Sequence, residues 1–235
     1  MTVGSAGRPS LPLVVCYGGT FDPVHLGHLG AVRDVRARTG CEQLRLIPCH
    51  VPPHRGRPGA SGAQRAAMLR LAAAGLEGVR VDPRELERDG PSYTVDTLAS
   101  LRAEFGEGVA LAWVLGTDAL AELDRWYQWR RLVTLAHLLV LDRPGAPRPG
   151  TGAVAELVAA RTAATVAELR AEPAGRIWFV HQRPVPVAAT EVRAALASGR
   201  RAEHLLPPEV WAYIRRAGLY LADGPAAQGA TAESE

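Results

Sequence analysis

The feature that most constrains the fold is an alternation of short apolar runs with helical patterns along most of the chain. Most of the apolar runs are continuous rather than alternating, as in strands that are covered on both faces. The six runs span residues 13–17, 44–47, 79–82, 110–115, 137–141 and 176–181. This order predicts an α/β fold with a doubly wound (Rossmann-like) parallel sheet, which binds ligands at the carboxyl ends of its strands.

Helical patterns fill the intervals between these runs. Apolar residues between positions 26 and 35 share one helical face, and Ser61 with Gln64 has the pattern of a capping box at the start of the next helix. Further helices are expected over 95–104, 126–136, 153–169 and 190–197, and a small C-terminal helical segment over 207–220.

Stretches rich in Pro and Gly mark the expected loops. Residues 49–62 should form a long loop over the ligand site, and residues 144–152 a second linker. The domain organisation expected from these patterns is a flexible N-terminus over 1–10, one domain over 11–221 and a disordered tail over 222–235.

The basic residues exclude several kinds of chemistry. All 27 are Arg, because the 235-residue chain contains no Lys. A chain without Lys can form neither a Schiff base nor a P-loop, whose phosphate-binding Lys is obligatory. The formal net charge of +3 is too small to argue for a nucleic-acid partner.

Cysteine usage and hydropathy bear on the compartment. The three Cys contain no CxxC pair, so they predict no disulfide framework and suit a reducing environment. No apolar run approaches the roughly 20 residues of a membrane span, and the N-terminus lacks the pattern of a signal peptide. We therefore expect a cytoplasmic protein that is not in a membrane.

The segment that carries chemistry is GGTFDPVHLGH, residues 18–28, at the junction of the first apolar run and the first helix. Its glycines let the backbone approach a ligand, and the helix N-terminus offers unpaired N–H groups and a partial positive charge. His25 and His28 are three positions apart, so both should project to one side and donate to one phosphoryl group. A metal pair is the alternative, although neither a carboxylate nor a third ligand accompanies the two His.

This segment resembles the nucleotide-binding signature of the HxGH nucleotidyltransferase superfamily, and also the HIGH motif of class I aminoacyl-tRNA synthetases. The synthetases need a second, Lys-rich loop, which this chain cannot have. Later segments are similar, in order and spacing, to the bacterial nicotinate mononucleotide adenylyltransferase family, so that the resemblance covers about residues 13–221. These segments are 46–48, 51–55, 90–98, 115–120, 125–127, 143–145 and 190–193.

The resemblance implies an ATP site made of two distant segments. Thr190 should be the N-cap of a helix that carries Arg193, so that N–H groups, a hydroxyl and a guanidinium meet the β- and γ-phosphates. The catalytic residues implied are His25, His28 and Arg193. The ATP-binding residues implied are Gly18, Gly19, Thr20, Phe21, Arg143, Thr190 and Arg193.

The resemblance also implies a mononucleotide site. The turn at Tyr93 and Thr94 would offer backbone N–H groups to the nicotinate carboxylate, and Trp126 a ring face to the pyridine. The alternative for residues 125–131 is an amphipathic helix with its indoles packed inward. The mononucleotide-binding residues implied are His50, His54, Arg55, Tyr93, Thr94, Gly116, Asp118 and Trp126.

The chain departs from the family pattern in two segments. Cys49 and His50 stand where many relatives carry an Asn pair, and Ala188 stands where a Ser is usual in the phosphate turn. Phosphate binding there must therefore rest on backbone N–H groups, Thr190 and Arg193.

The reaction expected from the resemblance is transfer of the adenylyl group of ATP to nicotinate mononucleotide, giving deamido-NAD and pyrophosphate. Mg²⁺ is expected as a cofactor that arrives with ATP, with no metal ligand from protein side chains. The alternatives are a nicotinamide mononucleotide adenylyltransferase and a nucleotide-binding regulatory protein without turnover. The sequence does not decide the oligomeric state, and a homo-oligomer stays open.

Overall fold

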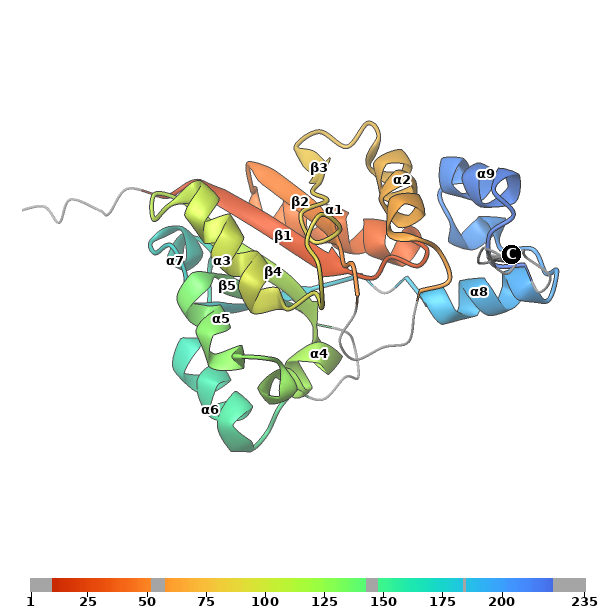
Figure 1. The fold of residues 1–235 in the computed structure, drawn as a ribbon. Coiled ribbons are helices and arrows are strands. Elements are labelled where there is room, and N and C mark those ends of the chain that lie inside the picture. The colour runs from red at the N-terminus through yellow and green to blue at the C-terminus, as the bar shows by residue number, and fades with distance from the viewer. Residues whose placement is uncertain (1–9, 52–57, 143–147, 184, 222–235) are drawn as a thin grey trace, which may run out of the picture.

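The computed structural model describes residues 10–51, 58–142, 148–183 and 185–221. Within this part of the chain, six strands form one parallel sheet in the order β3-β2-β1-β4-β5-β6 (Figure 1). The order turns between β1 and β4, which is the switch point of a doubly wound fold, so the predicted fold class is confirmed. The strands are β1 (Leu13–Gly19), β2 (Gln43–Pro48), β3 (Val79–Val81), β4 (Ala110–Gly116), β5 (His137–Asp142) and β6 (Ile177–His181).

Helices cover both faces of the sheet (Figure 1). Successive residues of β1 point to opposite faces, so Leu13 and Val15 join one buried cluster while Val14 and Cys16 join the other. The first cluster includes residues of α1 (Leu26–Thr39), α2 (Gly62–Ala73), α7 (Val166–Arg170), α8 (Ala189–Ala197) and α9 (Pro208–Arg216). The second includes residues of α3 (Thr94–Phe105), α4 (Thr117–Ala121), α5 (Trp129–Leu135) and α6 (Gly152–Arg161).

Three predicted helices differ from those observed. The helix expected over 126–136 begins only at Trp129, because Gln128 has a left-handed backbone with φ 50°. The one expected over 153–169 is two helices, because Thr165 and Glu168 form a capping box that starts α7. The C-terminal helix ends at Arg216, shortly before Gly218 at φ 59°.

The other predicted elements agree with the structure. The capping box of α2 is present, with the Gln64 amide donating to Ser61 Oγ at 3.2 Å and the Ser61 amide to Gln64 Oε1 at 2.8 Å. Among the described residues, we find no helix with the length and apolar character needed to cross a bilayer. The predictions for residues 1–9 and 222–235, and those for the parts of the two predicted loops at 52–57 and 144–147, lie outside the described residues.

Two short 3-10 helices complete the described chain, η1 (Leu123–Arg125) and η2 (Glu203–Leu205). Figure 1 shows α8 and α9 gathered beyond one end of the sheet, beside α2. This arrangement brings the C-terminal part of the chain to the same end as the turn between β1 and α1, where the predicted site lies.

Candidate active site

At the turn after β1, the backbone carries no side chain at the position closest to the neighbouring strand. A Cβ on Gly18 would collide with the indole of Trp113 on the neighbouring strand β4, so only Gly fits there. Phe21, two residues beyond Gly19, is buried with φ at 50°, a left-handed conformation that a side chain of this size rarely adopts. Strain of this kind persists where the surroundings fix it, and it clusters at functional sites.

The two His of the motif lie together, as predicted, although His25 is the N-cap of α1 rather than a residue inside the helix. The rings of His25 and His28 are stacked, with centroids 3.7 Å apart. The His25 amide donates to His28 Nδ1 at 3.2 Å. Because an accepting ring nitrogen carries no hydrogen, the neutral His28 ring has its proton on Nε2 and presents a donor there.

Asp22 joins this turn to the C-terminal part of the chain. Its carboxylate is buried and accepts the amides of Gly59 at 2.8 Å and Ala60 at 3.1 Å. The Tyr220 hydroxyl donates to the same carboxylate at 2.7 Å, and burial together with the Asp22 charge raises the pKa of this hydroxyl. Arg193 of α8 donates to the Asp22 carbonyl at 2.6 Å. The two predicted phosphate-binding segments therefore meet at Asp22.

Arg65 of α2 is a buried support that the sequence did not reveal. Its guanidinium is almost fully covered and donates to the carbonyls of Thr20 at 2.8 Å and Ala60 at 3.2 Å. A third bond, at 3.5 Å, goes to the carbonyl of His50. Arg65 thus ties the β1 turn, the start of α2 and the end of β2 into one frame.

The prediction that Thr190 is the N-cap of α8 is wrong. The cap is Ala188, whose backbone is extended at φ −122° and ψ 145°, and Thr190 lies exposed inside the first turn. Ala188 has no side-chain oxygen, so no side chain caps the first amides of the helix. The helix start still offers N–H groups to an anion, with Arg193 one turn further on.

The predicted mononucleotide residues after the end of β2 and at the start of α3 are neighbours. The Ser92 amide donates to the Val51 carbonyl at 3.0 Å, and the His50 amide donates to Ser92 Oγ at 2.8 Å. The Tyr93 amide is already bonded to the Pro91 carbonyl at 3.1 Å, so it is not one of the groups that a carboxylate would meet here. Thr94 is the first residue of α3, and its amide is among the first-turn donors.

Aromatic residues lie beside this helix start. Trp126 is half-buried against the core on the α3 side, whereas Tyr127 is 51% exposed and its ring centroid is 4.7 Å from that of Tyr93. Tyr127 was not among the predicted site residues, although it follows Trp126 in the same motif.

Asp118 is exposed in the first turn of α4, and a Cβ on Gly116 would collide with its carboxylate. His54, Arg55 and Arg143 lie outside the described residues.

A family model described as cytidylyltransferase-like matches residues 16–195. The chain belongs to this cytidylyltransferase-like family. The matched range contains the motif at 18–28 and Arg193, the two segments that meet at Asp22.

Curated relatives extend the similarity beyond the range of the family model. The chain is 45% identical to a "Probable nicotinate-nucleotide adenylyltransferase" of Cellvibrio japonicus, over 91% of this chain and 99% of that protein. Proteins with the same name in Aeromonas hydrophila and Halorhodospira halophila are 46% and 47% identical, over 89% and 91% of this chain and 97% of each relative.

Solved structures support the fold of this cytidylyltransferase-like chain. It resembles a nicotinic acid mononucleotide adenylyltransferase of Plasmodium falciparum complexed with NaAD, with a TM-score of 0.67 and 14% identity. The similarity covers 89% of this chain and 97% of that one. The same protein complexed with APC matches with a TM-score of 0.65.

The two segments that meet at Asp22 offer the imidazoles of His25 and His28, the Arg193 guanidinium and the backbone amides of a helix start. A guanidinium and backbone N–H groups donate hydrogen bonds and do not ligate a metal ion, so the set suits phosphate. Within the described ranges, no group of three or more His, Cys, Asp or Glu is arranged to hold a metal ion. In a cytidylyltransferase-like protein this set can bind a nucleotide triphosphate and stabilise charge on its phosphoryl groups.

Proposed function

We propose that the protein transfers the adenylyl group of ATP to the 5'-phosphate of nicotinate mononucleotide, forming deamido-NAD and pyrophosphate on the route to NAD. The observation that carries this proposal is the meeting of the His25–His28 motif with Arg193 of α8 at Asp22. The name shared by relatives of about 45% identity over about nine-tenths of the chain supports the same reaction.

The proposed step needs neither a general base nor a covalent intermediate, because the attacking mononucleotide phosphate is already an anion. One of its oxygens bonds to the α-phosphorus of ATP, and the bond from that phosphorus to the bridging oxygen breaks. The electron pair leaves with pyrophosphate. Alignment and charge stabilisation then supply the catalysis. His25 and His28 would stabilise the α-phosphoryl group, and Arg193 with the first amides of α8 the departing pyrophosphate.

Selection of the acid over the amide would come from the start of α3. A helix N-terminus has a partial positive charge and N–H donors, which attract the nicotinate carboxylate. The carboxamide of the competing mononucleotide has an NH₂ group, which cannot accept these bonds. Tyr93 and Tyr127 present aromatic surface next to the same helix end, where a pyridine ring can stack.

We also propose that Mg²⁺ enters the site with ATP, bound mainly to the ATP phosphates. Bound there, it would neutralise part of the charge that His25, His28 and Arg193 meet. A cytoplasmic location, the absence of a nucleic-acid partner and a homo-oligomeric assembly stay predictions.

A substrate comparison tests the function. The protein is incubated with ATP, Mg²⁺ and either mononucleotide, and pyrophosphate release is followed. Release with the nicotinate compound in clear excess over the nicotinamide compound is the expected result. Release with nicotinamide mononucleotide alone would make the protein the sister enzyme, and no release with either would favour a nucleotide-binding protein without turnover.

A further inference from the structure

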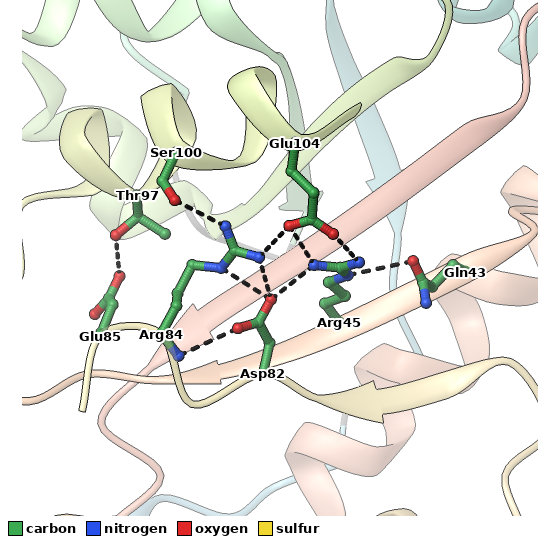
Figure 2. A network of polar contacts seen from close by, with 8 residues as sticks. All are labelled: Gln43, Arg45, Asp82, Arg84, Glu85, Thr97, Ser100 and Glu104. Carbon is green, nitrogen blue, oxygen red and sulfur yellow. Dashed lines mark hydrogen bonds and ion pairs between the residues drawn. The ribbon is translucent and has the colours of Figure 1, made fainter. Parts of the chain in front are cut away.

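A buried carboxylate lies behind the predicted mononucleotide site. Glu85 follows β3 and is 4% exposed, and burial is the main cause that raises its pKa. Thr97 of α3 donates its hydroxyl to Glu85 Oε1 at 2.6 Å (Figure 2). No role for Glu85 follows from the motif residues, and a carboxyl group buried to this degree needs an explanation.

The donors around Glu85 have fixed directions. A guanidinium can only donate, so Arg88 donates to Thr97 Oγ1 at 3.0 Å and the Thr97 hydrogen is left for Glu85. Against the effect of burial, the side chains of Thr97 and then Ser92 lower the pKa of Glu85 by hydrogen bonding, which places the Ser92 hydroxyl next to the same carboxylate. The Ser92 oxygen accepts the His50 amide at 2.8 Å, so its hydrogen too is left for Glu85. Glu85 is therefore the shared acceptor of two hydroxyl groups.

These bonds close into a ring at His50. His50 Nδ1 lies 3.0 Å from the carbonyl oxygen of Arg88, the same residue that donates to Thr97. Because a carbonyl oxygen only accepts, Nδ1 carries the hydrogen, and Nε2 of the neutral ring is an acceptor. The ring of bonds thus fixes both the position and the tautomer of His50.

The same ring sets the distance between His50 and the start of α3. Ser92 lies two residues before Thr94, and it is bonded to the segment after β2 through its own amide, which donates to Val51, and through its side chain, which accepts from His50. We infer that Glu85 is a positioning residue of the mononucleotide site, which holds His50 and the first amides of α3 at the spacing that the mononucleotide requires. This inference rests on the proposed function.

A second network on the same helix provides a matched control. Glu104, near the other end of α3, accepts from Arg45 and Arg84 at 2.6 Å each, and both Arg also bind Asp82 (Figure 2). Ten residues of helix separate Glu104 from Thr94, or about 15 Å. A change at Glu104 therefore perturbs α3 without touching the bonds at His50.

The test compares Glu85→Gln with Glu104→Gln. A Gln at position 85 replaces one carboxylate oxygen with an NH₂ group, which donates instead of accepting, and removes the charge, so the bonds to the two hydroxyl groups are weakened. For Glu85→Gln we expect the KM for nicotinate mononucleotide to rise about 10-fold, the size of losing one buried hydrogen bond. The KM for ATP and kcat at saturation should stay within about 2-fold, because the ATP donors are not in the ring. Glu104→Gln should leave all three constants within about 2-fold.

Two further measurements keep the inference open to refutation if Glu85→Gln folds poorly. Ser92→Ala removes the link to His50 and should give the same selective rise in KM, and the two changes together should be non-additive. Nitrogen NMR of His50 should show the hydrogen on Nδ1 in the unmodified protein and a mixture of tautomers in either variant.

The outcomes separate this inference from the proposed function. A protein that turns over nicotinate mononucleotide while Glu85→Gln and Ser92→Ala leave its KM unchanged, or raise both KM values alike, overturns the role of Glu85 alone. An unmodified protein that neither turns over nicotinate mononucleotide nor binds it in calorimetry overturns both.

Discussion

His28 shows how one backbone bond can set the chemistry of a side chain. Its Nδ1 accepts the amide of His25, so the hydrogen of the neutral ring lies on Nε2, and this ring is stacked on that of His25. In a chain without Lys, donors of this kind must do the work that an ammonium group does at other phosphate sites.

His28→Ala should therefore lower kcat by about 100- to 1,000-fold, the usual loss when one transition-state donor is removed. The fold should remain intact, because His28 is only half-buried, Phe21 keeps its ring contact with Tyr17, and the His25 carbonyl still accepts the first amides of α1. Steady-state kinetics and circular dichroism check both points. His204→Ala, at an exposed position in η2, is the control and should keep full turnover. Unchanged turnover in His28→Ala would contradict the role assigned to this residue.

At the scale of elements, the sequence predicts those helices and strands that a local pattern of residues specifies. The apolar runs gave six strands in parallel because both faces of the sheet are buried. The helix break before Thr165 was missed although Thr165 and Glu168 carry a readable capping signal, whereas the turn at Gln128 has no such signal. Arg65 and Tyr220 were missed for another reason: they reach the site through tertiary contacts, and one Arg among 27 looks like any other.

The start of α8 yields a prediction about stability. Ala188 is exposed and has the extended backbone of an N-cap without a capping oxygen. Ala188→Ser should stabilise the protein by about 1 kcal/mol, because its hydroxyl can accept a first-turn amide. Ala194→Ser, at an exposed interior position of the same helix, should have the opposite sign, because Ser is a poorer helix former than Ala. Chemical denaturation of both variants measures the difference, and equal shifts in the same direction would contradict the N-cap assignment.

The ion pairs of Glu104 with Arg45 and Arg84, which tie α3 to the sheet, yield a prediction about pH. The hydrogen bond from Arg45 is the main cause that lowers the pKa of Glu104 below its ordinary value of 4.5. A carboxyl group with a lowered pKa stabilises the folded state above its unfolded pKa, and this stabilisation is lost as the pH falls through the folded pKa. Glu104→Gln should therefore cost stability at pH 7 and make the loss of stability below pH 4.5 shallower. Urea denaturation from pH 7 to pH 3 measures the free energy of unfolding of the unmodified protein and of Glu104→Gln. Identical pH profiles would contradict a stabilising role of these ion pairs.

At the scale of the whole molecule, the sheet separates two buried clusters while the site lies at one end of its strands. The core should therefore become accessible to solvent only by global unfolding, whereas the site should become accessible by local opening. Cys16 lies at the centre of β1 and is fully buried, so a reagent reaches it only when the sheet unfolds. Cys49 follows β2, is 9% exposed, and is bonded to the motif turn through its amide, which donates to the Gly19 carbonyl at 3.0 Å. Local opening at the site is enough to expose it.

Thiol labelling can distinguish these two kinds of opening. Burial raises the pKa of Cys16 to about 12 and also raises that of Cys49, so at pH 8 both are protonated and react slowly even when reached. With an aromatic disulfide reagent, Cys49 should react well before Cys16, and all three Cys should react at once in guanidinium chloride. ATP with nicotinate mononucleotide should slow the reaction of Cys49 and leave that of Cys16 limited by global unfolding. Cys49→Ser identifies the early phase. If Cys16 were labelled as fast as Cys49 in the native protein, the sheet and the site would open as one unit, and the separation of core from site would be wrong.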